Sequence, residues 1–231
     1  ARSSPCAASA ALARRRKIAR QQGTRLMGFY SRFIAPGLID CACGAKPVAY
    51  QRRKIIPQAS GVVLEIGAGG GRNFAFYDRA KVSRLIALEP EPGMVKRGRA
   101  RAPEGLPIEW LERGAETANL PPASIDTIVT TYTLCTIPDA VAALAALRPA
   151  LKPDGKLLFC EHGLAPDADA VKWQKRIEPI WRPLAGGCHL TRDVDVMLAT
   201  SGWRIETADR MYLPGTPRWA GYNVWGSARP A

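Results

Sequence analysis

The stretch VVLEIGAGGGRN, residues 62–73, determines the fold expected for this 231-residue chain. Residues 62–66 are mostly apolar and have the length of a buried strand, and glycines follow at 67, 69, 70 and 71. Glycine is unfavourable inside regular structure, and it fits where the backbone turns tightly or approaches another group closely. A strand, a glycine turn and a helix N-terminus together form a cradle for a cofactor, because bare backbone and helix N–H groups face the ligand.

Strand and helix patterns alternate along the rest of the chain. We predict strands at 62–66, 84–89, 107–112, 126–131, 156–161, 203–210 and 222–228, and helices at 72–79, 93–101 and 138–151, with a turn at LKPDGK (151–156). This order predicts a parallel sheet with helices on both faces. The last two strands are joined too closely for a crossover helix, so they should pair as an antiparallel hairpin. The expected fold class is α/β: a doubly wound, Rossmann-like seven-strand sheet, mainly parallel with an antiparallel edge hairpin.

The formal net charge of +13 is concentrated at the N-terminus, where eight Lys and Arg residues precede the first acid, Asp40. An acid-free, Arg- and Ala-rich start is typical of an organelle transit peptide, a basic helix on an anionic surface or a solvated tail. We divide the chain into a basic extension (1–24), a helical lid or substrate-side segment (25–58) and a main domain (59–231). The middle segment should hold one helix at 26–34, ended by Pro36-Gly37, and a second at 47–58.

The six cysteines favour reduced thiols in a cytosol-like compartment, because they are few and include no CxxC pair. Cys41 and Cys43 lack a second pair at zinc spacing, so we expect no metal. Cys135 lies in an apolar segment and is interpreted as a small apolar filler rather than a nucleophile. No apolar run approaches the roughly 18–20 residues of a membrane span.

Three classes of ligand compete for the glycine loop. A phosphate P-loop requires GxxxxGK[ST], which does not follow Gly67, and the dinucleotide fingerprint requires a glycine where Arg72 stands. The spacing Glu65-x-Gly67-x-Gly69-x-Gly71 instead resembles the (D/E)xGxGxG motif of class I S-adenosylmethionine-dependent methyltransferases.

Other landmarks of that family follow in the same order. LIALEP ends the second strand at Glu89, where an acid can accept both hydroxyls of a ribose. RGAETANLP (113–121) resembles the adenine loop, SIDTIVTTYTLCTIPD (124–139) the fourth strand with its loop, and LRPALKPDGKLLF (147–159) the approach to the fifth strand. The resemblance implies that S-adenosylmethionine is the cofactor, with Glu65 and Asn73 at its ammonium and carboxylate. The cofactor-binding residues that it implies are Glu65, Gly67, Ala68, Gly69, Asn73, Glu89, Pro90, Met94, Ala115, Glu116 and Thr131.

The flanking segments extend the resemblance over residues 25–228. YSRFIAPGLID (30–40), CGAKPVAYQRRKIIP (43–57), EHGLAPD (161–167) and WQKRIEPIWRPLAGGCHLTRD (173–193) resemble the methyltransferase-like family of microsomal alkyl-thiol methyltransferases and their bacterial relatives. This implies S-methylation of small thiols or hydrogen sulfide. The mammalian members carry an N-terminal hydrophobic anchor where this chain is rich in arginine, so we expect a cytoplasmic enzyme, or alternatively an organellar or membrane-peripheral one.

The chemistry of thiol methylation fits a site with little catalytic apparatus. The sulfonium is already a strong electrophile, so the protein mainly aligns the two reactants. A thiol with a pKa near ~8.5 is partly ionised at neutral pH, and a dry pocket favours the loss of charge when thiolate meets sulfonium. As the proton acceptor we predict His162, after the fifth strand and with Glu161 holding its tautomer, or His189, before a helix capped by Thr191. The predicted substrate pocket is roofed by Phe29, Tyr30, Phe33, Trp173 and Trp181.

Three other functions remain open. The first is N- or O-methylation of a lipid amine or small metabolite. The second is nucleic-acid methylation, suggested by a pI of 9.9, although 130–133 lacks the (N/D/S)PP(Y/F) motif of amino-methylating enzymes and the charge lies in the first 54 residues. The third is a non-catalytic S-adenosylmethionine-binding module. We expect a monomer that acts on a small-molecule thiol, binds no nucleic acid and contacts membranes peripherally through its basic N-terminus.

Overall fold

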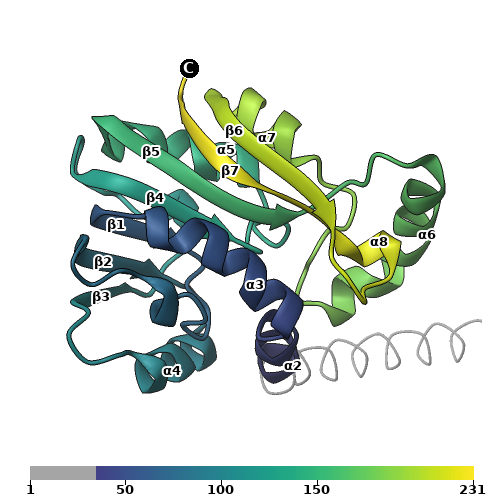
Figure 1. Cartoon of the computed structure of the whole chain (residues 1–231), viewed down its shortest axis with the longest axis horizontal. Coiled ribbons are helices and arrows are strands. Elements are labelled where there is room, and N and C mark those ends of the chain that lie inside the picture. The colour runs from purple at the N-terminus through teal and green to yellow at the C-terminus, as the bar shows by residue number, and fades with distance from the viewer. Residues whose placement is uncertain (1–34) are drawn as a thin grey trace, which may run out of the picture.

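A seven-strand sheet organises the computed structural model, which describes residues 35–231. The strands are β1 (Gly61–Ile66), β2 (Val82–Leu88), β3 (Ile108–Leu111), β4 (Ile125–Thr131), β5 (Leu151–His162), β6 (Trp203–Tyr212) and β7 (Tyr222–Pro230). Their order across the sheet is β3-β2-β1-β4-β5-β7-β6 (Figure 1). β1 to β5 are mutually parallel, and β7 runs antiparallel to both β5 and β6. The predicted fold class is confirmed, with β6 as the edge strand of the hairpin.

Helices cover both faces of this sheet. They are α2 (Ala35–Cys43), α3 (Lys46–Ile55), α4 (Pro92–Arg101), α5 (Ala140–Leu147), α6 (Ala168–Leu184), α7 (Val194–Thr200) and α8 (Arg218–Gly221). Short 3-10 turns lie at η2 (Ile56–Gln58), η3 (Phe74–Phe76), η4 (Ala115–Thr117) and η5 (Arg148–Ala150). Within residues 35–231, no helix combines the length and apolar character that crossing a membrane requires.

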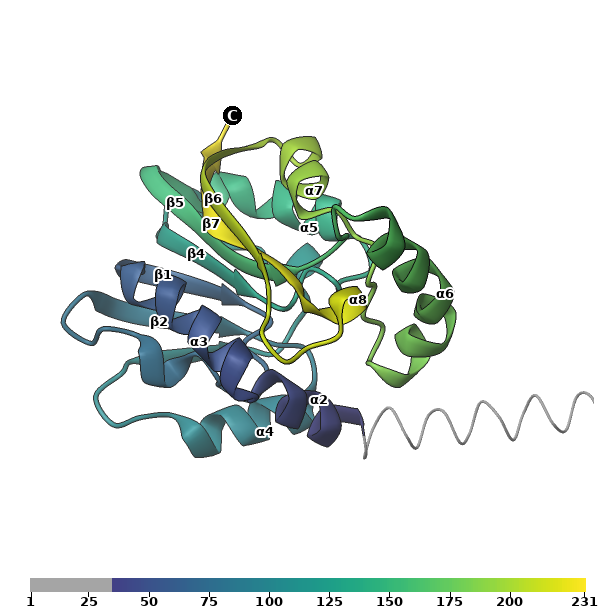
Figure 2. The ribbon, with the colours of Figure 1, turned by 45° about the vertical axis from the view of Figure 1, so that its right-hand side comes forward.

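Side chains that alternate along the central strands form two apolar cores, because successive residues of a strand point to opposite faces. Leu64 and Ile128 point to the face covered by α5 and α7. Val63 and Val129 point to the other face, where Ile55 at the end of α3 packs against them. Figure 2 shows α3 and α5 on opposite sides of the sheet. The parallel strands are therefore buried on both faces, as their continuous apolar sequences predict.

The segment after the glycine loop is not the helix predicted at 72–79. Only the 3-10 turn Phe74–Phe76 forms there, and Tyr77 already has an extended backbone. The hydroxyl of Tyr77 donates to the carboxylate of Glu65, 2.7 Å away, and Asn73 contacts the same carboxylate. These bonds to a buried acid hold the segment against the sheet in place of a helix.

Three other local predictions were wrong. Pro36-Gly37 lies in the first turn of α2, where proline is tolerated, and does not end a helix. β5 starts at Leu151, so LKPDGK belongs to the strand, and a shift in register between Ile125 and Thr127 of β4 accommodates it. α7 is capped by Asp193, which accepts from the N–H of Val196, and not by Thr191. The helix predicted at 26–34 lies outside the described residues.

Candidate active site

A cavity of about 420 Å³ lies at the carboxyl ends of β1, β2 and β4. The strand order reverses between β1 and β4, and open α/β sheets bind their ligands at such a switch point. A hollow of about 170 Å³ shares Gly67, Glu89, Thr133 and Thr136 with it. Of the predicted cofactor residues, Gly67, Ala68, Gly69, Glu89, Met94 and Thr131 line the cavity, and Pro90, Ala115 and Glu116 line the hollow.

The glycine loop is shaped by close contacts. Gly67 has a φ of +64°, and a Cβ there would lie 2.3 Å from the side chain of Thr133. Gly71 has a φ of +73°, and its Cβ would lie 2.6 Å from the ring of Phe74. A larger residue would therefore suffer both backbone strain and a clash at either position. The loop leaves the backbone of residues 67–70 exposed to the cavity.

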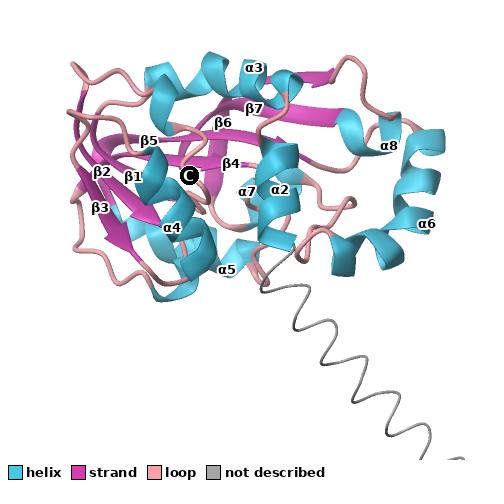
Figure 3. Ribbon diagram, turned by 90° about the horizontal axis from the view of Figure 1, so that it is seen from below, coloured by secondary structure: helices cyan, strands magenta, loops and turns pink. Residues whose placement is uncertain are grey.

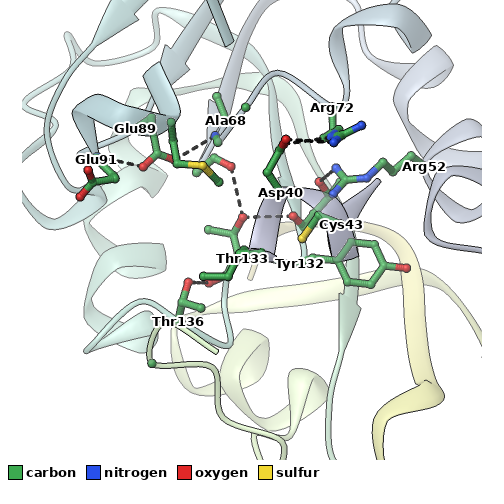
Figure 4. A pocket seen from close by; sticks show the side chains of 18 of the residues that line it. Asp40, Cys43, Arg52, Ala68, Arg72, Glu89, Glu91, Tyr132, Thr133 and Thr136 are labelled. Atoms are coloured by element: carbon green, nitrogen blue, oxygen red, sulfur yellow. Dashed lines mark hydrogen bonds and ion pairs between the residues drawn. The ribbon is translucent and has the colours of Figure 1, made fainter. Parts of the chain in front are cut away.

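Glu89 follows β2 and lines both the cavity and the hollow. Figure 4 shows its side chain at the cavity. Its two carboxylate oxygens accept from the backbone N–H groups of Gly69 and Glu91, each at 2.9 Å. Burial raises its pKa above the ordinary value, although these two hydrogen bonds oppose the shift. The carboxylate is thus fixed in position and still borders the cavity, as a group that receives ribose hydroxyls requires.

Glu65 and Asn73 do not line the cavity, although the sequence placed them at the ends of the cofactor. Glu65 is fully buried, and it accepts from the Tyr77 hydroxyl and from Asn73 Nδ2, at 2.7 and 3.0 Å. Burial raises the pKa of Glu65 to about 7. Asn73 in turn accepts from Arg52 through its Oδ1. Neither residue lines the cavity. Asn73 instead links the buried Glu65 to Arg52, which does line it.

Arg52 is one of the lining residues that were not predicted from the sequence. It lies on α3, is 5% exposed and donates through Nη1 to Asn73 Oδ1 and Thr131 Oγ1, both at 2.6 Å. Its guanidinium lies over the ring of Tyr132, and its Nε has no hydrogen-bond partner. Within residues 35–231, no carboxylate forms an ion pair with it. A buried cation with neutral partners is costly, so this position suits an anionic group of a ligand.

Asp40 joins α2 to the glycine loop and to α4, on the side of the cavity that α2 lines. Its buried carboxylate pairs with Arg72 from the glycine loop, with both oxygens at 2.9 Å, and with Arg101 from α4 at 2.8 and 2.7 Å. Burial raises its pKa, but the hydrogen bonds from Arg101 and Arg72 outweigh it and hold the pKa below the ordinary value. Figure 3 shows α2 between α4 and α6. The segment 25–58 thereby contributes Ile39, Asp40, Cys43 and Arg52 to the cavity wall.

Neither predicted catalytic histidine lines the cavity. His162 ends β5, with its Nε2 3.2 Å from Cys188 Sγ and its ring stacked on Tyr132, which does line the cavity. Burial lowers the pKa of His162, but the charge of the Cys188 thiolate outweighs this and raises it. His189 Nδ1 lies 3.0 Å from Glu178 Oε1.

Glu161 does not hold the tautomer of His162. Its carboxylate accepts from Thr130 Oγ1 and from the backbone N–H groups of Thr133 and Leu134. Adjacent residues of a strand point to opposite faces, so Glu161 and its neighbour His162 face different surroundings. Glu161 thus orders the loop after β4, and burial raises its pKa to about 7.

Of the predicted aromatic roof, the two described residues, Trp173 and Trp181, do not line the cavity. Phe29, Tyr30 and Phe33 lie outside the described residues. Trp173 is 53% exposed and lies below Arg176, away from the lining. Trp181 packs edge-on against Trp219 and donates its Nε1–H to Cys188 Sγ. The part of the wall near α6 comes instead from Pro183, Gly186 and Gly187.

Comparisons with known proteins agree with this architecture. Residues 64–159 match the family described as a methyltransferase domain. Thiol S-methyltransferase TMT1B of Homo sapiens is 32% identical over 151 residues, which cover 62% of this chain and 61% of the relative. TMT1B of Rattus norvegicus is 32% identical over 136 residues, which cover 57% of this chain and 55% of the relative. The chain thus matches less than two thirds of the length of these relatives.

A solved structure shows the same fold at low identity. A SAM-dependent methyltransferase from Leishmania major superposes with a TM-score of 0.64 and 19% identity, and covers 87% of this chain and 80% of the other. The methyltransferase resemblance noted in the sequence is therefore confirmed. Residues 64–159 match a methyltransferase domain, and the sheet around them has the fold seen in S-adenosylmethionine-dependent methyltransferases.

Proposed function

We propose that this chain transfers the methyl group of S-adenosylmethionine to the sulfur of a small thiol. The choice of cofactor is supported by the cavity and the hollow, which offer separate places for its ribose, its adenine and its methionine group. Glu89 is positioned for the ribose, and Ala115 and Glu116 line the hollow next to it, where the adenine would lie. Arg52 lies at the other end, where its buried guanidinium supplies a partner for the methionine carboxylate.

The single observation that favours a thiol is that residues 35–231 place no free base at the acceptor side of the cavity. In the described lining, the three carboxylates are Asp40, Glu89 and Glu91. Asp40 is held by two arginines, and Glu89 and Glu91 accept from backbone N–H groups at the cofactor side. An alcohol ionises too weakly to react without a base, whereas a thiol with a pKa near ~8.5 supplies some thiolate unaided.

The rest of the acceptor side is apolar or soft. Ile39, Cys43, Tyr132 and Pro183 line it, together with the backbone of Gly186 and Gly187. A thiolate and a sulfonium neutralise each other during the transfer, and apolar surroundings favour the loss of charge. The named activity of the TMT1B relatives agrees with this assignment.

The test is release of S-adenosylhomocysteine by the full chain with a panel of alkyl thiols, hydrogen sulfide, phenols and amines. We expect turnover with thiols and sulfide, and with Glu89→Ala a large loss of turnover at limiting cofactor. Turnover with amines or phenols and none with thiols would refute the thiol proposal and assign an N- or O-methyltransferase activity. Cofactor binding without turnover on any acceptor would support a binding module instead. Vesicle sedimentation with and without residues 1–24 tests the proposed peripheral membrane contact.

A further inference from the structure

Two thiols and an imidazole converge behind the cavity wall. Cys135 lies in the loop after β4, His162 ends β5 and Cys188 lies in the loop after α6. The two sulfur atoms and one ring nitrogen all lie within 4.8 Å of one another, and His162 Nε2 is 3.2 Å from Cys188 Sγ. Both cysteines are buried. The cluster therefore joins three parts of the chain at a point that the proposed methyl transfer does not use.

We propose that Cys135, His162 and Cys188 bind one zinc ion. Thiolate and imidazole are the ligands that zinc prefers, with Zn–S near 2.3 Å and Zn–N near ~2.0–2.1 Å. In a tetrahedral site these bond lengths put the ligand atoms roughly 3.4–3.8 Å apart, which lies within the observed envelope. The ligands require only small shifts of side chains, because their backbones already converge.

The surroundings of the cluster support thiolate ligands. The indole Nε1–H of Trp181 donates to Cys188 Sγ at 3.3 Å, and a hydrogen bond of this kind stabilises a charged sulfur. The N–H of His189 donates to the carbonyl of Cys135 at 2.9 Å, which ties the loop of Cys188 to that of Cys135. A disulfide between Cys135 and Cys188 would account for the two cysteines but not for His162, whose Nε2 lies 3.2 Å from Cys188 Sγ.

Three protein ligands leave a fourth position for a ligand from outside the chain, as in catalytic rather than structural zinc sites. The cluster adjoins the cavity wall: Tyr132 stacks on His162, and Thr136 and Gly187 are the chain neighbours of Cys135 and Cys188. No metal was expected from the sequence, because Cys41 and Cys43 lack a second pair at zinc spacing. These three ligands are separated by whole secondary-structure elements.

The experiment uses the full chain, reduced and stripped of metal with a chelator. Zinc bound per chain is counted by elemental analysis after dialysis, and Co²⁺ is added separately as a spectroscopic probe. We expect one zinc per chain, and a Co²⁺ spectrum with tetrahedral ligand-field bands and sulfur-to-cobalt charge transfer. Cys135→Ser, Cys188→Ser and His162→Gln should each weaken zinc binding by about 100-fold or more, since even outer-shell changes cost about 10–100-fold.

Cys41→Ser is the matched control, because this cysteine is exposed on α2 and lies outside the cluster. It should retain full zinc binding, and circular dichroism checks that every variant is folded. Absence of zinc from the folded wild type, or binding that survives all three cluster substitutions, overturns the proposal. Recovery of a metal-free chain with a Cys135–Cys188 disulfide in the presence of reductant and zinc overturns it as well. None of these readouts depends on methyl transfer, so failure here is distinct from failure of the proposed function.

Discussion

Replacing Glu65 with glutamine should remove a pH-dependent loss of stability. This acid is fully buried, and burial raises its pKa to about 7 from an ordinary value of 4.5. Between those values the folded chain keeps a proton that the unfolded chain has released. The folded state therefore binds more protons, and the free energy of unfolding falls as the pH rises through this window. Glutamine resembles the protonated acid and does not ionise, so Glu65→Gln loses this dependence.

The size of the effect follows from the shift in pKa. A difference of 7 − 4.5 = 2.5 pKa units corresponds to ~3.4 kcal/mol at about 1.36 kcal/mol per unit. About 2.5 kcal/mol of this falls between pH 5 and pH 8, because the titration is already under way at pH 5. The glutamine oxygen can accept from Asn73 Nδ2, and its NH₂ then faces the Tyr77 hydroxyl, which must change from donor to acceptor. This rearrangement costs about 1 kcal/mol at every pH and leaves the slope unchanged.

The assay is urea unfolding of wild type and Glu65→Gln at a series of pH values from about 5 to 8. The free energy of unfolding should fall less steeply with pH in the variant, by ~2.5 kcal/mol over this range, with an unchanged m-value. Glu161→Gln should behave alike, since burial raises that pKa to about 7 as well. Glu104→Gln, at an exposed position, is the control and should run parallel to wild type. Parallel curves for Glu65→Gln and wild type would refute the assignment of a buried, protonated acid.

Four further predictions concern the site. Glu89→Ala should weaken S-adenosylmethionine binding by about 1–3 kcal/mol in calorimetry, because a charge-assisted hydrogen-bond acceptor is lost; unchanged affinity would contradict the ribose assignment. Arg52→Met should weaken S-adenosylmethionine binding by a similar ~1–3 kcal/mol but leave methylthioadenosine, which lacks the carboxylate, unaffected; equal losses for both ligands would indicate a structural role. Neither His162 nor His189 lines the cavity, so His189→Asn should keep the wild-type pH–rate profile, and a rate lowered most below the pKa of the thiol would instead assign proton acceptance to His189. Deletion of residues 1–22 should leave turnover on a soluble thiol nearly unchanged, and a loss of turnover in a folded deletion variant would assign that segment to the active site.

Local sequence patterns were sufficient to predict the sheet and the glycine loop. The alternation of apolar strands and helices predicted a mainly parallel seven-strand sheet with an antiparallel hairpin, because a parallel sheet buried on both faces requires continuous apolar strands. The glycine loop was equally predictable, because glycine adopts the positive φ of residues 67 and 71 without strain and a Cβ there would clash. Glu89 lines the cavity, and its position after a strand could be predicted because the end of a strand is itself a local feature.

Long-range contacts decided the rest. Arg52 appears in the sequence as one of several cations on a basic helix, and only the docking of α3 on the sheet buries it beside Thr131. Glu65 belongs to the cofactor motif, yet the contacts of Tyr77 and Asn73 place it beneath the cavity. Whether a polar side chain faces a ligand or the protein depends on which elements pack around it. Those contacts join residues far apart in the chain, so no local pattern encodes them, whereas strand periodicity and glycine geometry are set by each residue and its immediate neighbours.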